Sequence, residues 1–131
     1  MLKEDKSRTF TWAEMAFFSK WWKEQSQENK DRFKQLVEDK QFEFVHGGWS
    51  LNDELVSHYE DIITNMMKGH EFLKQEFEIT PKIAWHLDQF GHSLNQAALF
   101  KQMGFDYFVF TRAPYNLKQK LREEKKLEFE W

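Results

Sequence analysis

The segment WHLDQFGHS, residues 85–93, combines two histidines and an aspartate directly after the apolar run KIA. His86 and Asp88 are two residues apart, so in an extended chain their side chains point to the same side. They would then offer a nitrogen and an oxygen ligand to one divalent ion. A His-x-Asp pair also recurs by chance. The alternative is a polar strand end, in which Asp88 accepts bonds from loop amides and His92 packs before a helix.

Asp88 has a second candidate role, which depends on Arg112 after the next apolar run. A carboxylate held beside a cation stays ionised and can attack an electrophilic carbon. Arg112 is expected at the end of the following strand, where its guanidinium would hold Asp88 in place. The alternative for Arg112 is an ordinary ion pair on the surface.

Short β-rich runs alternate with helical patterns along the chain, and these elements must position the side chains above. We predict strands at residues 8–13, 42–46, 82–87, 105–110 and 127–131, and helices at residues 14–25, 30–39, 95–103 and 116–126. Ser93 and Gln96 are expected to form a capping box at the start of the helix at 95–103. The alternation predicts an α/β fold built of parallel β/α layers.

A further long helix is predicted between the second and third strands, capped by Asn52 or Asp53 and ended by Thr80-Pro81. Its apolar residues recur at a three-four spacing that forms one helical face. They are Val56, Tyr59, Ile63, Met66, His70, Leu73 and Phe77. On this face His70 is expected to be a hydrogen-bonded core histidine rather than a ligand.

The unusual side chains fall just past the carboxyl ends of the predicted strands. They are Glu14, Gly48-Trp49, Asp88 and Arg112. In parallel α/β folds that edge is where functional sites assemble, because the strand ends and their loops converge there. The pattern therefore favours one site at this edge, although any loop of this kind tends to be polar.

Composition excludes several classes of function. The net charge is −3 and the basic residues are scattered among acidic ones, so we expect no nucleic-acid partner. No apolar run is long enough to span a membrane, and the absence of cysteine removes disulfides and thiol chemistry. The aromatic content of 18% suits either a Phe-rich core, the favoured reading, or walls that bind sugar rings.

The order and spacing of several motifs resemble those of the class II α-mannosidases of glycoside hydrolase family 38. The matching segments are EMAFFSKWW, FVHGGWSLNDE followed by His58-Tyr59, WHLDQFGHS, AALFKQMGFDYFVFTR and LEFEW. Together they cover essentially the whole chain. The resemblance implies part of a seven-stranded, parallel, barrel-like β/α catalytic domain. It also implies a retaining glycosidase that removes α-linked mannose from glycans and depends on zinc or a similar divalent ion.

By the same resemblance, Asp88 is both the catalytic nucleophile and a metal ligand, and Arg112 lies beside it. Trp49, in the matched segment FVHGGWSLNDE, is a candidate contact for the sugar substrate. A retaining mechanism also needs a second carboxylate about 5–5.5 Å from the nucleophile. A divalent ion on the sugar hydroxyls would help to orient and distort the ring.

The chain departs from the family pattern at several points. The family's first-strand His-x-Asp motif, its acid/base aspartate and a further histidine ligand lie outside residues 1–131. We therefore expect residues 1–131 to be a partial catalytic domain, with the first strand and the downstream part missing, that is inactive alone and takes its other metal ligands from elsewhere. Gln89 stands where the family usually has proline, and His86 occupies a variable position, which weakens it as a ligand.

Two other functions stay open at this level. One is a non-catalytic relative that binds a glycan or a protein through its aromatic surface. The other is a metal-dependent carbohydrate deacetylase, in which His86 would be an essential ligand.

Overall fold

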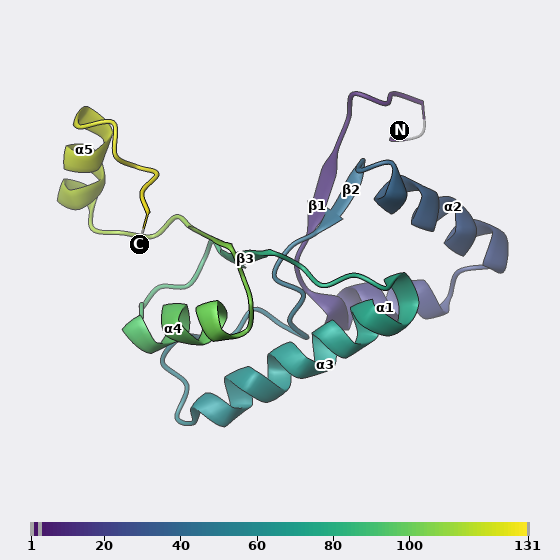
Figure 1. Cartoon of the computed structure of the whole chain (residues 1–131), viewed down its shortest axis with the longest axis horizontal. Coiled ribbons are helices and arrows are strands. Elements are labelled where there is room, and N and C mark those ends of the chain that lie inside the picture. The colour runs from purple at the N-terminus through teal and green to yellow at the C-terminus, as the bar shows by residue number, and fades with distance from the viewer. Residues whose placement is uncertain (1, 3, 131) are drawn as a thin grey trace.

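The structure, a computed structural model, describes residue 2 and residues 4–130 of the chain. In this part of the chain four strands alternate with five helices (Figure 1). The elements are β1 (Phe10–Trp12), α1 (Met15–Lys23), α2 (Gln27–Glu38), β2 (Phe42–Phe44), α3 (Tyr59–Phe77), β3 (Ile83–His86), α4 (Leu94–Gln102), β4 (Tyr107–Phe110) and α5 (Tyr115–Glu123). None of the helices described is long and apolar enough to cross a membrane.

The strands form two parallel pairs, so the prediction of a parallel α/β arrangement is confirmed. β1 pairs with β2, with Phe10 opposite Phe42, and β3 pairs with β4, with Ile83 opposite Tyr107. The two pairs meet just after β2, where the His46 amide donates to the Ile83 carbonyl at 2.6 Å. Successive strands therefore lie in chain order, each connected to the next through helices.

Helices cover one face of each strand pair. In β2 the side chains of Phe42 and Phe44 are buried while Glu43 between them is exposed. In β3 the buried residues are Ala84 and His86, and the intervening side chains are only partly covered. Because alternate residues of a strand point to opposite faces, the described chain covers one face and leaves the other largely open.

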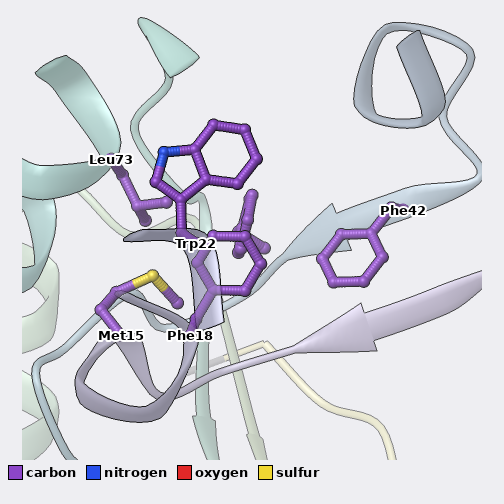
Figure 2. Close-up of a cluster of buried hydrophobic side chains, with 6 residues drawn as sticks. Met15, Phe18, Trp22, Phe42 and Leu73 are labelled. Atoms are coloured by element: carbon purple, nitrogen blue, oxygen red, sulfur yellow. The ribbon is translucent and has the colours of Figure 1, made fainter. Parts of the chain in front are cut away.

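The covered face of β1 and β2 packs on an aromatic core. Phe18 and Trp22 of α1 are buried against Phe42 and Phe44 of β2, and Met15 and Leu73 complete the buried set (Figure 2). Phe18 lies at its centre, with its ring centroid 4.9 Å from that of Phe44 in an edge-to-face arrangement. The high aromatic content therefore serves core packing, as the composition favoured.

A second, smaller core lies under β3 and β4. Its buried members are Met66, Ala84, Phe100 and Phe105. β4 is less buried than its apolar sequence predicts, because Tyr107 is 68% exposed and the next three residues are only partly covered. In the described chain β4 pairs with β3 alone, so its other edge carries no strand.

α3 approaches the turn after β2 more closely than any side chain would allow. A Cβ atom at Gly69 would lie 1.9 Å from the Gly47 carbonyl oxygen. Gly47 itself has a φ of +78°, in the left-handed region that favours glycine. The buried line of the helix therefore runs through Ile62, Met66, Gly69 and Leu73. It lies beside the predicted stripe, and Tyr59 is consequently 61% exposed.

The start of the long helix was predicted wrongly. α3 begins at Tyr59, so neither Asn52 nor Asp53 caps it. Asp53 instead accepts a bond from the Leu55 amide, a local turn that competes with helix formation. The end also differs: the helix stops at Phe77, and Glu78 adopts a left-handed conformation before Thr80-Pro81 is reached.

The predicted strand at 127–131 does not form within the described residues 127–130, and residue 131 lies outside them. Leu127 and Phe129 are 53% and 55% exposed, so these apolar side chains have no covering layer in the described chain. α5 likewise buries none of its residues, and Figure 1 shows it apart from the other helices.

Candidate active site

The parallel pairing of β3 and β4 brings Asp88 and Arg112 together. His86 lies opposite Phe110 in the register, and the two site residues each follow two positions later. Arg112 donates from Nε to Asp88 Oδ1 at 3.1 Å and from Nη2 to the same oxygen. The Thr111 hydroxyl also donates to the Leu87 carbonyl, which joins the two strand ends directly.

The Asp88–Arg112 pair is open to solvent. The side chains are 79% and 53% exposed, so the ion pair contributes little to stability. Both bonds fall on Oδ1, and Oδ2 has no hydrogen-bond partner among the described residues. The ring of Phe90, itself 80% exposed, lies 5.9 Å from the Arg112 Cζ atom. The pair therefore presents one unoccupied carboxylate oxygen to the outside, beside an aromatic ring.

The structure does not place the His86 side chain beside that of Asp88. β3 ends at His86, so the extended conformation that would align residues 86 and 88 does not continue. The His86 ring is fully buried, and its Nδ1 donates to Glu54 Oε1 at 2.9 Å. Burial lowers the pKa of His86, although the bond to Glu54 opposes it. The structure thus places His86 in the core on Glu54 and not beside Asp88 as a pair of ligands.

Glu54 is the site residue that the sequence did not reveal. Its side chain is 1% exposed, and it lies in the irregular segment between β2 and α3. Oε1 accepts from His86 Nδ1 and contacts His92 Nδ1 at 3.1 Å, while Oε2 accepts from the Ser93 amide at 2.8 Å. A glutamate in the polar stretch LNDE carries no local signal of burial, so only tertiary contacts identify it.

Glu54 also explains why the predicted capping box is wrong. Ser93 occupies the N-cap position of α4, but its hydroxyl makes no cap bond. The Ser93 amide, which Gln96 would satisfy in a capping box, is satisfied by Glu54 instead. Gln96 is buried and accepts a bond from the Asn52 side chain at 3.0 Å.

Two further contacts, both partly buried, hold the segments of the site together. Gln89, at the position where the family resemblance would place proline, donates to the Asn52 carbonyl at 3.1 Å. His70 Nε2 donates to the His46 carbonyl at 2.8 Å, so the expectation of a hydrogen-bonded core histidine is confirmed. Both contacts join the segment after β2 to elements that carry or support the site.

Trp49 lies elsewhere. Its ring packs on the edge of the aromatic core and lies 4.2 Å from the Lys68 ammonium nitrogen. Its amide donates to Asn65 and its carbonyl accepts from Ala16. These contacts are with α3 and α1 rather than with the Asp88–Arg112 pair, so its role in substrate binding stays a prediction.

A hollow of about 160 Å³ opens at the carboxyl ends of β1, β2 and β3. Its lining residues are Thr11, Trp12, Ala13, Glu14, Val45, Leu51 and Trp85. Glu14, which was singled out at the end of the first strand, accepts a bond from the Leu51 amide here and so holds the wall of the hollow. Trp85 comes from the open face of β3, so the hollow lies at the edge where the site was expected.

The described chain does not contain a complete metal site. No group of three or more histidine, cysteine or acidic side chains that could hold a metal ion occurs in residue 2 or residues 4–130. The exposed carboxylate of Asp88 fits as an oxygen donor to such an ion.

The structure shows parallel strand pairs joined by helices, with a carboxylate just after one strand end. Comparison with known proteins identifies the family. A sequence model of the "Glycosyl hydrolases family 38 N-terminal domain" matches residues 1–131. The chain therefore belongs to glycosyl hydrolase family 38.

Its relatives carry matching names. The chain is 47% identical to a probable alpha-mannosidase of Arabidopsis thaliana, over 99% of this chain and 12% of the relative. It is 46% identical to a lysosomal alpha-mannosidase of Dictyostelium discoideum, over 95% of this chain and 12% of the relative. It is 47% identical to the lysosomal alpha-mannosidase of Mus musculus, over 98% of this chain and 13% of the relative. The chain thus spans about an eighth of the length of these relatives.

Proposed function

We propose that this chain is the nucleophile-bearing part of a retaining, metal-dependent alpha-mannosidase that hydrolyses terminal α-linked mannose from glycans. The observation that carries the proposal is the exposed Asp88 carboxylate, held through one oxygen by Arg112. Membership of family 38 and the names of the relatives support the substrate class.

In the proposed reaction Asp88 acts through its free oxygen. Oδ2 attacks the anomeric carbon of mannose, and the bond from that carbon to the glycosidic oxygen breaks. The leaving oxygen takes a proton from a second carboxylic acid, which lies outside this chain. Water then gives a proton to that second carboxylate and cleaves the mannosyl–Asp88 ester, which restores the aspartate. Arg112 fixes the carboxylate so that one oxygen points outward throughout.

Zinc, or a similar divalent ion, is the proposed cofactor, and Asp88 is its only proposed ligand in this chain. When bound, such an ion would orient the sugar hydroxyls and favour distortion of the ring. The open faces of the two strand pairs are consistent with a larger, seven-stranded barrel completed by the rest of the protein. We accordingly propose that residues 1–131 by themselves neither turn over mannosides nor bind zinc tightly.

The direct test is Asp88→Asn in the full-length protein that contains this chain, with Asp106→Asn as the control. Asp106 is an exposed aspartate at the opposite end of β4. Removing the nucleophile should lower kcat on an aryl α-mannoside by at least about a thousandfold. The control should keep parental activity.

A 2-fluoro-mannosyl fluoride, which forms the ester but hydrolyses slowly, should label the parent on the peptide that contains Asp88 and leave the Asp88→Asn variant unlabelled. Full activity of Asp88→Asn, or labelling of a different carboxylate, would refute the assignment. Two further measurements test the finer points. The first mannose anomer released should be the α form, and a chelator should abolish turnover until zinc is returned.

A further inference from the structure

The segment that carries Arg112 has little secondary structure to hold it. Residues 111–114, between β4 and α5, are neither helix nor strand. Arg112 itself is 53% exposed, so packing does not fix its side chain. Its position therefore depends on individual hydrogen bonds to the backbone around it.

The described residues show one hydrogen bond to the backbone of Arg112, and it comes from His92. His92 Nε2 lies 2.6 Å from the Arg112 carbonyl oxygen, and Nδ1 lies 3.1 Å from Glu54 Oε1. A carbonyl and a carboxylate only accept hydrogen bonds, so both ring nitrogens of His92 must donate. A histidine that donates from both nitrogens is an imidazolium cation. The buried Glu54 carboxylate supplies its counter-charge.

The titratable and charged groups around His92 are consistent with this protonation. Glu54 faces it from the segment before α3, His86 from β3 and Arg112 from the segment after β4. The ring of Phe110 in β4 packs against it with centroids 5.6 Å apart. Burial lowers the pKa of His92, but the Arg112 carbonyl and the Glu54 carboxylate outweigh it and raise the pKa overall.

The two histidines on Glu54 therefore differ in charge. His86 is fully buried and needs only its Nδ1–H for Glu54. His92 is 38% exposed at its side chain and needs both N–H groups. With one neutral ring, one cationic ring and one carboxylate, the cluster of His86, His92 and Glu54 has no net charge. Arg112 and Asp88 form a separate ion pair.

We propose that Glu54 and His92 are positioning residues for the glycosidase reaction, because Glu54 holds His92, His92 holds the Arg112 backbone, and Arg112 holds the nucleophile Asp88. The inference rests on the proposed function, since it gives the network a nucleophile to position. It also makes turnover depend on the charge of a residue that never touches the substrate. The contact exists while His92 is protonated and is lost as pH rises through its pKa in the folded state.

The test uses the full-length protein and the variants His92→Phe and Glu54→Gln, with Asp106→Asn as the control. His92→Phe keeps a flat ring of similar size but cannot donate, so kcat should fall about 10–100-fold while KM changes by less than about threefold. Glu54→Gln keeps an acceptor for the Ser93 amide but removes the charge. The alkaline limb of its kcat–pH profile should move to lower pH, because the imidazolium loses its counter-ion.

Chemical rescue separates positioning from packing. In His92→Ala, added imidazole should restore part of kcat, and only at pH values where imidazole is protonated. If His92→Phe proves insoluble, Glu54→Gln and this rescue decide the question.

The proposal is overturned if Asp88→Asn is inactive while His92→Phe and Glu54→Gln keep the parental kcat and pH profile. An unshifted alkaline limb in Glu54→Gln, or rescue by neutral imidazole, would also overturn it. Failure of the proposed function is a different result, namely full activity of Asp88→Asn.

Discussion

Replacing Gly69 by alanine tests the close approach of α3 to the turn after β2, from which the segment with Glu54 extends. The added Cβ would lie 1.9 Å from the Gly47 oxygen, 2.6 Å from the Gly48 carbonyl carbon and 2.8 Å from the Trp49 nitrogen. All three are backbone atoms, so no side-chain rotation relieves the overlap. Helix and turn must separate by about 1.5 Å to bring the 1.9 Å contact to an ordinary contact distance.

That separation affects two hydrogen bonds across the contact. They run from the Trp49 amide to the Asn65 carbonyl at 3.0 Å and from His70 to the His46 carbonyl at 2.8 Å. Each is worth about 1 kcal/mol, and overpacking costs about 1–3 kcal/mol. The better helix propensity of alanine returns about 1 kcal/mol. We expect a net loss of about 3 kcal/mol in the free energy of opening this region.

Hydrogen exchange of the full-length protein, followed by mass spectrometry, measures this loss locally. Peptides that cover residues 45–50 and α3 should exchange about a hundredfold faster in Gly69→Ala. Thr64→Ala, at an exposed position of the same helix, should change the free energy of opening by less than about 0.5 kcal/mol. Exchange rates in Gly69→Ala within threefold of the parent would show that the backbone contact gives way cheaply and that the reasoning is wrong.

Two further predictions concern local stability. Ser26→Ala should destabilise the start of α2 by about 1 kcal/mol, since the Ser26 side chain accepts a bond from the Asn29 amide. Ser93→Ala should cost less than about 0.5 kcal/mol, since the Ser93 hydroxyl makes no cap bond in α4. Hydrogen exchange at the two helix starts compares these costs, and equal costs would contradict the assignment. Burial lowers the pKa of His46 far below its ordinary value, so the unfolded chain binds a proton that the folded chain rejects. As the pH drops below about 6.5, the free energy of opening around His46 should therefore fall by about 1.4 kcal/mol per pH unit. Hydrogen exchange measures this after the rates are corrected for the intrinsic pH dependence of exchange. Corrected rates that stay constant from pH 7 to 5 would refute the prediction.

The strand-end site could be predicted because it depends on short-range patterns. Alternating or continuous apolar runs mark β2, β3 and β4, and helices between them impose parallel pairing. Once β3 and β4 are parallel neighbours, residues that follow each strand by the same number of positions lie side by side. Asp88 and Arg112 meet for that reason, and their contact follows from the sequence before any side chain is placed.

The remainder of the site depends on contacts between distant parts of the chain. Glu54 and His92 are 38 residues apart, and no periodicity or motif links them. Asn52, Ser93 and Gln96 have the right types and spacing for helix caps, but longer-range partners compete for the same groups. Capping patterns fail to predict these positions because a buried carboxylate must accept hydrogen bonds from the donors that lie nearest in space, whatever their distance in the sequence.

The sequence by itself thus determined the α/β alternation and the parallel order, since these follow from residue periods of two and about 3.6. The choice of Asp88 as the nucleophile candidate came from the resemblance of its motif to that of a known family. Only the tertiary structure decided that His86 turns into the core, that Glu54 is buried beneath it and that His92 reaches the Arg112 backbone. These outcomes depend on how α3 and the segment before it pack against β3. That packing is fixed by contacts such as Gly69 on the Gly47 carbonyl, which no local pattern specifies.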